Sequence, residues 1–243
     1  MLHNYKKNIY SQNGEDGILL EILKRVKFLK NKNKWCCEFG AWDGIRGSNT
    51  FNLVKNLKFN AVYIEGDKKK FKKLVKNSNK FSKIIPINKY ISHKKNSKFT
   101  LDKVLKKTNI PRKFEILSID IDSYDLSVWE SLKNYKPEIV IIEINSGIKP
   151  GICQKNSLKN KGNSFTSTLK VGIKKGYRLV CHTGNCIFVK KKFIKKIALN
   201  KKYLNNPNLL FDYTWLDKKE SGLKKILKTI LPSFILDFLR NLK

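Results

Sequence analysis

Three carboxylates lie within six positions of a segment that reads SIDIDSYD, residues 118–125. They belong to Asp120, Asp122 and Asp125, in a chain with only 19 acidic residues against 52 basic ones. If the strand that precedes them continues, Asp120 and Asp122 point to the same side, because side chains alternate along a strand. Such a pair can act as a general base, or can bind a divalent cation through oxygen ligands.

A second interpretation of the same segment is that these acids only stabilise the local backbone. Asp125 then caps the helix that follows, and Asp120 and Asp122 accept hydrogen bonds from backbone amides in the turn. We expect the capping role for Asp125 and a functional role for Asp120 and Asp122.

Carboxylates also mark the ends of three other predicted strands. They are Glu38, Glu65 and Glu143, in the segments 35–40, 60–66 and 138–144. The carboxyl ends of neighbouring parallel strands meet at one edge of a sheet, where ligands of such folds bind. Four strand ends that each carry a carboxylate, in a chain poor in acids, therefore predict a functional site at this edge.

The loop after the first strand indicates the class of ligand. EFGAWDG, residues 38–44, has glycines that allow close approach to the backbone, but it is not the GxGxxG of dinucleotide-binding folds. Acids in this loop repel a pyrophosphate and suit a cationic ligand. Glu65 is placed to accept hydrogen bonds from both hydroxyls of a ribose. S-adenosylmethionine, an adenosine that carries a sulfonium and an amino group, meets these conditions.

Four segments together resemble the FkbM-type S-adenosylmethionine-dependent methyltransferases. They are EFGAWDG, YIEGD, LSIDIDSYD and IVIIEIN. The resemblance covers roughly residues 10–190 and is closer still to a bacterial branch that opens with an SQxGEDG-like segment, here SQNGEDG at 11–17. It implies a Rossmann-like methyltransferase fold and methyl transfer from S-adenosylmethionine. Two positions depart from the family pattern, since Trp42 and Ser123 stand where glycine is common.

The resemblance also implies roles for the matching residues. The cofactor-binding residues that it implies are Glu38, Gly40, Ala41, Asp43, Gly44, Glu65 and Asp120. Asp120 and Asp122 fall on the acid pair after the fourth strand and are the candidate catalytic residues. With Glu143, which matches the acid closing the fifth strand, they form a candidate set for a divalent cation such as Mg²⁺, an arrangement that resembles metal-assisted sugar and catechol methyltransferases.

The elements that position these residues alternate along the chain. Short apolar runs predict strands at 35–40, 60–66, 83–88, 114–120 and 138–144. Apolar residues at helical spacing predict helices at 17–29, 48–57, 67–77, 99–107, 125–135 and 164–177. Residues 177–191 predict a hairpin turned at Thr183–Gly184–Asn185. This order predicts an α/β fold, with a mostly parallel sheet, helices on both faces and a C-terminal antiparallel hairpin.

Three further motifs have more than one interpretation. SQNGEDG either folds over the cofactor mouth, with Glu15 and Asp16 at the ligand, or begins a helix with Ser11 or Asn13 as its cap. His93 follows the third strand in a polar loop, so we expect it to be solvated. His182 lies in the hairpin, and we expect it to be structural, with no Ser or Cys partner in a catalytic triad.

Composition bears on the substrate. The formal net charge is +33, which attracts phosphates, anionic lipids and acidic glycans. Lysine supplies most of it, and arginine, the better ligand for bases and phosphates, is scarce. We expect O-methylation of a sugar or glycan precursor. The alternatives are RNA methylation, although the fourth strand end lacks the Asn/Asp-Pro-Pro-aromatic signature, and a non-catalytic nucleotide- or polyanion-binding protein.

The C-terminal part is expected to differ from the rest. We predict a methyltransferase-like domain at 1–200 and an extension at 201–243. Its segment 221–243 is a basic amphipathic helix, which either lies in a membrane interface or packs on protein. No signal-peptide pattern or long apolar span is present in the sequence, so we expect a cytoplasmic protein, with contact to the inner membrane surface as a hypothesis.

Overall fold

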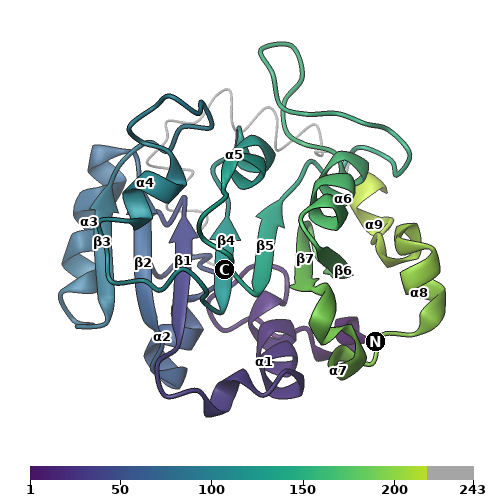
Figure 1. Ribbon diagram of the computed structural model, residues 1–243, viewed down its shortest axis with the longest axis horizontal. Coiled ribbons are helices and arrows are strands. Elements are labelled where there is room, and N and C mark those ends of the chain that lie inside the picture. The colour runs from purple at the N-terminus through teal and green to yellow at the C-terminus, as the bar shows by residue number, and fades with distance from the viewer. Residues whose placement is uncertain (218–243) are drawn as a thin grey trace. The chain divides into compact units, whose positions relative to one another are not determined.

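The strands form one seven-stranded sheet in the computed structural model, which describes residues 1–217. They are β1 (Trp35–Phe39), β2 (Asn60–Glu65), β3 (Ile84–Asn88), β4 (Ile116–Ile119), β5 (Ile139–Glu143), β6 (Tyr177–His182) and β7 (Asn185–Lys190). Their order across the sheet is β3-β2-β1-β4-β5-β7-β6 (Figure 1). The first five strands are parallel, and β7 runs antiparallel to both β5 and β6. The predicted parallel sheet and closing hairpin are confirmed.

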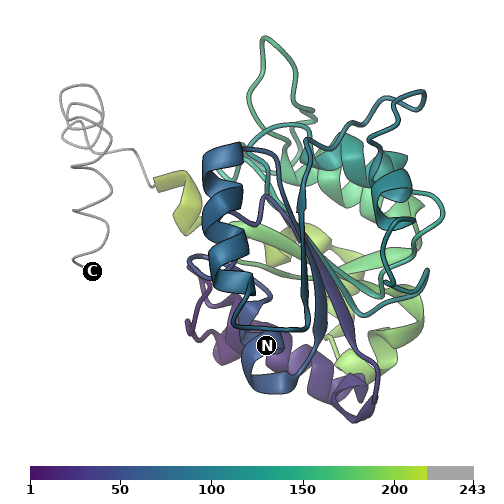
Figure 2. The same ribbon diagram turned by 90° about the vertical axis from the view of Figure 1, so that its left-hand side faces the viewer.

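Helices cover both faces of this sheet (Figure 2). On one face lie α1 (Glu15–Arg25), α2 (Phe51–Leu57), α3 (Lys68–Ser78) and α7 (Ile194–Ile197), whose apolar residues share one core with Ala61, Tyr63 and Ile141. The other face carries α4 (Leu101–Leu105), α5 (Asp125–Ser131) and α6 (Phe165–Lys174). There Trp129 of α5 packs on Phe188 of β7, with ring centroids 5.1 Å apart.

Burial explains why the apolar runs form strands. All five residues of β1 and all four of β4 are buried, as expected for central strands covered on both faces. In α1 the buried apolar residues recur at helical spacing: Ile18, Leu19, Ile22 and Leu23, all fully buried. Burying one such side chain stabilises the fold by about 1.5–3 kcal/mol. Periodicity and packing therefore favour the same elements.

The remaining elements are short. They are η1 (Leu2–Tyr5), η2 (Phe28–Lys30), η3 (Lys191–Phe193), α8 (Lys201–Asn205) and η4 (Pro207–Leu210). The first compact unit extends from Met1 to Asp212, so it includes residues 201–212, which the sequence analysis placed in the extension. The second unit begins at Tyr213, and its described element is α9 (Thr214–Asp217).

No helix among residues 1–217 is both long enough and apolar enough to span a membrane. The amphipathic helix predicted at 221–243 lies outside the described residues.

Candidate functional site

The strand-end carboxylates share one face of the sheet as well as one edge. In the register, Glu38 lies beside Tyr63 on one side and Ser118 on the other, and Ser118 lies beside Ile141. Side chains in register point to the same face, and so do those two positions farther along. Glu65, Asp120 and Glu143 therefore extend from the carboxyl edge on the face that bears α1, α2 and α3. The sequence predicted the shared edge but not the shared face.

Gly40 brings the loop after β1 against the end of β4. Its φ is +81°, and a Cβ built there would lie 1.5 Å from the carbonyl oxygen of Asp120. Any other residue would force these two segments apart. Gly44 and Trp42 also have positive φ, +78° and +47°. Trp42 thus takes the backbone conformation for which glycine is usual in this loop, and the loop keeps its course despite the large side chain.

Glu65 fastens this loop to the end of β2. Its side chain is buried, and its two carboxylate oxygens accept from the amides of Trp42 and Asp67, both at 2.8 Å. The amides of Gly40 and Ala41 both donate to the carbonyl of Ile64. Glu65 therefore lies directly beside the glycine loop, at the place predicted for a ribose-binding acid.

Glu38 and Asp43, two of the predicted cofactor-binding residues, accept hydrogen bonds from residues that follow the glycine loop. The Glu38 carboxylate is buried and accepts from the hydroxyls of Ser48 and Thr50 at 2.7 and 2.5 Å. Burial raises the pKa of Glu38, and these hydrogen bonds lower it. Asp43 Oδ1 accepts from the amides of Ile45 and Arg46, each at 2.9 Å. Both acids therefore stabilise the conformation of the chain that follows β1.

Asp120, Asp122 and Glu143 form a cluster beyond the ends of β4 and β5. One carboxylate oxygen of each lies within 4.8 Å of the others. Burial, followed by the charges of Asp125 and Asp122, raises the pKa of Asp120 to about 7. Burial and the charge of Asp120 raise the pKa of Glu143 to about 9, and the two side chains are hydrogen-bonded. The pKa of Glu143 is raised further than that of Asp120, so a proton shared by the pair resides on Glu143.

The cap predicted for Asp125 is wrong in its detail. Asp125 is the first residue of α5, and its cap position is occupied by Tyr124. The buried Asp125 carboxylate instead accepts from the amides of Ile121 at 2.7 Å and Ser123 at 3.0 Å. Asp125 therefore performs the turn-binding role that the second interpretation gave to Asp120 and Asp122. Asp122, with φ +57°, is exposed at the tip of the turn.

Four acids of this edge form no ion pair with the lysines and arginines of residues 1–217. Within residues 1–217, the ion pairs involve Asp43, Glu21, Glu130, Glu138 and Asp212. Glu65, Asp120, Asp122 and Glu143 take part in none of them. In a chain with 52 basic residues, the carboxylates at this edge remain available to a cationic ligand.

A groove that the sequence did not reveal opens beside Glu65, beyond β2 and β3. Its volume is about 630 Å³, and its lining residues are Gly66, Asp67, Lys68, Lys69, Asn88, Lys89, Tyr90 and Phe99. The Tyr90 ring lies so close to Gly66 that a Cβ there would meet it at 2.4 Å. An aromatic pair, Tyr90 and Phe99, thus borders the site next to the predicted ribose acid. Neither residue belongs to a motif, so their place at the site could not be predicted from the sequence.

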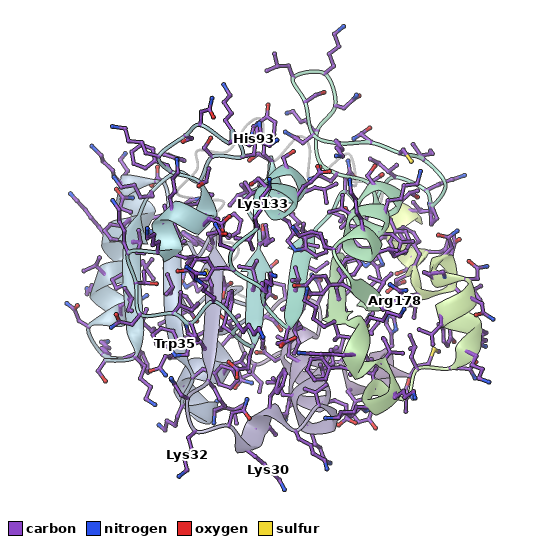
Figure 3. The ribbon with its side chains drawn as sticks, in the orientation of Figure 1. Lys30, Lys32, Trp35, His93, Lys133 and Arg178 are labelled. Atoms are coloured by element: carbon purple, nitrogen blue, oxygen red, sulfur yellow. The ribbon has the colours of Figure 1, made fainter. Side chains whose placement is uncertain are left out.

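His93 reaches the acidic turn from the loop after β3. Its ring stacks on Tyr124 at a centroid distance of 4.6 Å, and it lies toward the carboxyl ends of the strands in Figure 3. It is half-buried, so the prediction of a solvated side chain holds only in part. The stack connects the loop 89–100 to the turn that carries Asp120 and Asp122.

His182 is structural, as predicted, but it does have a serine partner. Its Nδ1 accepts from the Asp212 amide at 3.0 Å, so its Nε2 donates to Ser146 Oγ at 2.9 Å. Burial lowers the pKa of His182 to about 4. A ring whose free nitrogen already accepts from an amide cannot take a proton from Ser146, so this pair is not a nucleophile and base.

SQNGEDG contains the start of α1, and its Asp16 binds the backbone of residues 9–11. Four donors meet one oxygen of the buried Asp16: the amides of Ile9, Tyr10 and Ser11 and the Ser11 hydroxyl, each at 2.8 Å. Glu15 accepts from Thr183 at 2.7 Å and from Asn185 at 3.1 Å. The cap residue is Gly14 rather than Ser11 or Asn13, although Ser11 Oγ accepts from the Asp16 amide at 3.0 Å. The Gln12 side chain lies against Gly47, three residues after the glycine loop.

Comparison with known proteins agrees with this geometry. Residues 23–179 match the Methyltransferase FkbM domain. Among solved structures, the CurJ carbon methyltransferase has a TM-score of 0.50 at 7% identity and covers 77% of this chain and 56% of its own. TrmK of M. capricolum, solved with S-adenosylhomocysteine, has 0.43 at 20% identity, covering 90% and 92%. A putative O-methyltransferase from Klebsiella pneumoniae has 0.45 at 11%, covering 78% and 86%. None of the curated proteins matches.

The family match covers well over half of the chain and spans the glycine loop, Glu65, the acidic turn and Glu143. It contains every segment on which the sequence resemblance was based, apart from SQNGEDG. The protein belongs to the FkbM methyltransferase family and is an S-adenosylmethionine-dependent methyltransferase.

Proposed function

We propose that the protein transfers the methyl group of S-adenosylmethionine to a hydroxyl of a sugar or glycan precursor, at the carboxyl edge of the sheet. The observation that carries the proposal is the set of carboxylates there that no lysine or arginine among residues 1–217 neutralises. They suit a cationic cofactor, and one of them has a pKa near neutrality, as a general base requires.

The cofactor position follows from the loop and the groove. Glu65 would accept the ribose hydroxyls of the cofactor, and the groove bordered by Tyr90 and Phe99 would hold its base. Asp120 would lie on the side of the methionine part. Glu38 and Asp43 act indirectly, because they fix the loop that surrounds the cofactor. This assignment fits the donor set, since three lysines and one carboxylate, Asp67, line the groove, whereas Asp120, Asp122 and Glu143 gather where the sulfonium would lie.

Bound S-adenosylmethionine supplies an electrophilic methyl group, and the protein supplies alignment and a base. Asp120 accepts the hydroxyl proton of the acceptor, because it is the more acidic member of the hydrogen-bonded pair. Glu143 keeps its own proton and donates it toward Asp120, which holds the base in place. Asp122 is exposed at the turn.

A divalent cation is a second way to use the same acids. The donor set fits Mg²⁺, since Asp120, Asp122 and Glu143 each offer a carboxylate oxygen within 4.8 Å of the others. They would hold the ion, which would lower the pKa of the acceptor hydroxyl. Binding must displace the proton held by Glu143, so affinity must rise with pH. Calorimetry with Mg²⁺ in two buffers of different ionisation enthalpy measures that release. Activity unchanged by EDTA and by added Mg²⁺ would remove the metal.

Transfer assays distinguish the acceptor classes. S-adenosylhomocysteine formation is measured with sugar-based acceptors and with RNA, for the wild type and for Asp120→Asn. We expect turnover with a hydroxyl acceptor and a loss of at least about 100-fold in the variant, the range for removal of a general base. Turnover with RNA alone would favour the RNA alternative. Cofactor binding without turnover on any acceptor, with no effect of Asp120→Asn, would favour the non-catalytic alternative.

We also propose that the segment 221–243 contacts the cytoplasmic surface of the inner membrane. Such contact would suit a lipid-linked acceptor. The support is its alternation of apolar and basic residues in the sequence. Flotation with anionic liposomes tests it on the full chain and on a chain that ends at residue 220. Equal flotation of the two would exclude this role.

A further inference from the structure

A cavity between α5 and α6 is unusually rich in lysine. Its volume is about 460 Å³, and it lies at the amino end of β5, the end opposite to Glu143, where Pro137 enters the strand. Five of its twelve lining residues are lysines: Lys133, Lys136, Lys174, Lys175 and Lys190. Lysine and arginine together make up only 52 of the 243 residues of the chain. The cavity therefore concentrates positive charge beyond the average of an already basic protein.

Two of these lysines are half-buried and held in position. Lys175 Nζ donates to the carbonyls of Leu132 at 2.7 Å and Glu130 at 3.4 Å. Lys190 Nζ donates to the carbonyl of Lys175 at 3.3 Å and lies 3.8 Å from the centre of the Tyr177 ring. Burial lowers the pKa of both, and the charge of Lys190 adds to the effect on Lys175. An anion between them would offset this repulsion.

Two of the acids near the cavity pair with lysines outside it. Glu130 is the one carboxylate that lines the cavity, and it pairs with Lys155 at 2.6 Å. Glu138, next to the strand entry, pairs with Lys192 at 2.6 Å. Neither Lys155 nor Lys192 lines the cavity. A third nearby acid, Asp102, accepts from the amides of Lys133, Asn134 and Tyr135, and its charge acts on Lys175. The five lining lysines outnumber these three carboxylates.

Trp129, which lines the cavity, has an indole N–H without a hydrogen-bond acceptor among residues 1–217. Its side chain is fully buried. A buried donor without a partner costs about 1–3 kcal/mol. The other walls are apolar, formed by Leu132, Tyr135 and Val171. The cavity thus combines ammonium groups, an unpaired donor and an apolar surface.

We propose that this cavity is a binding site for a small phosphate-bearing anion, separate from the methyl-transfer edge and independent of the acceptor proposed above. Ammonium groups bind phosphate as point charges, and the volume suits a small organic phosphate whose carbon part rests on the apolar walls. Because Trp129 lines the cavity, a bound anion would change the environment of its indole N–H.

Calorimetric titration of the full chain with inorganic pyrophosphate, at fixed ionic strength, tests the site. The double variant Lys175→Met/Lys190→Met is compared with Lys30→Met/Lys32→Met, which removes the same charge at exposed positions outside the cavity (Figure 3). We expect the first to weaken binding at least tenfold and the second to change it less than twofold. Both should bind S-adenosylmethionine like the wild type, which separates this proposal from the one on the active edge.

Two further measurements guard against a folding defect. Lys133→Met/Lys136→Met, at exposed rim positions, should weaken pyrophosphate binding in the same direction. In a ¹H–¹⁵N spectrum, pyrophosphate should shift one indole signal, the one that Trp129→Phe removes. Equal losses in the cavity variants and in Lys30→Met/Lys32→Met, or an unmoved Trp129 signal, would overturn the proposal. So would binding of a single-stranded oligonucleotide without binding of pyrophosphate, which would indicate a polyanion surface instead.

Discussion

Asp120 is the residue on which the chemistry depends. It lies at the end of β4, against Gly40. Burial raises its pKa to about 7, and the hydrogen bond from Glu143 acts in the opposite direction. The sequence identified Asp120, Asp122 and Glu143 as a group because each follows a strand. It could not separate their roles from that of Asp125, since the choice depends on which carboxylate meets the amides of Ile121 and Ser123. That choice is made by backbone geometry, including the positive φ of Asp122.

The pH dependence of activity follows from the raised pKa of Asp120. A base works only when deprotonated, so kcat/KM should rise with pH and level off above about 7, falling roughly tenfold per unit below it. Glu143→Gln keeps a hydrogen-bond donor beside Asp120 and should keep the rising limb. A profile that is flat between pH 5.5 and 8 would show that Asp120 is not the base.

The stability of the folded protein should fall as pH rises, because of the buried carboxyl groups of Asp120 and Glu143. Because burial raises the pKa of Asp120 and Glu143, the folded state binds more protons than the unfolded state above about pH 4, so their contribution to stability falls as pH rises toward 9. Asp120→Asn should therefore melt above the wild type at pH 8, and this advantage should disappear near pH 4. Melting curves at the two pH values measure it. If Asp120→Asn melts below the wild type at pH 8, burial of the ionised Asp120 carboxylate does not destabilise the folded state.

At the scale of elements, the strands were predicted to within two residues, because their apolar runs are buried in the sheet. The α-helices up to β7 were predicted in the right places, with ends that differ by up to four residues. The short helices after β7 were not, since α7, α8 and η4 have four or five residues each and no full period. The groove at Tyr90 and Phe99 was also missed, because it depends on how the loop 89–100 folds back over β2.

The segment SQNGEDG gives a prediction at this scale. Asp16→Ala removes four hydrogen bonds from one buried oxygen and leaves the amides of Ile9, Tyr10 and Ser11 without an acceptor. We expect a loss of about 3–5 kcal/mol in the free energy of unfolding, measured by urea titration. Asp67→Ala, which removes a single exposed cap of α3, should cost only about 1 kcal/mol. Similar losses in the two variants would mean that the N-terminal segment does not depend on Asp16.

At the scale of the whole molecule, charge separates nonspecific from specific binding. A net charge of +33 attracts any polyanion, and that attraction weakens steeply with salt because counterions compete. Between 50 and 200 mM salt, affinity for a single-stranded oligonucleotide should fall at least about tenfold, while affinity for S-adenosylmethionine should change less than about twofold. Fluorescence titrations at the two salt concentrations measure both. Oligonucleotide affinity that persists at 200 mM would instead support the RNA alternative.

The central claim is that S-adenosylmethionine binds beside Glu65 at the carboxyl edge of the sheet. Isothermal titration of the full chain with S-adenosylmethionine tests it most directly, on the wild type, Glu65→Ala and Glu143→Ala. We predict saturable binding at one site, weakened more by Glu65→Ala than by Glu143→Ala, because Glu65 both holds the loop and accepts the ribose hydroxyls. Equal weakening by the two variants would contradict the assignment of Glu65, and no binding to the wild type would contradict the claim itself.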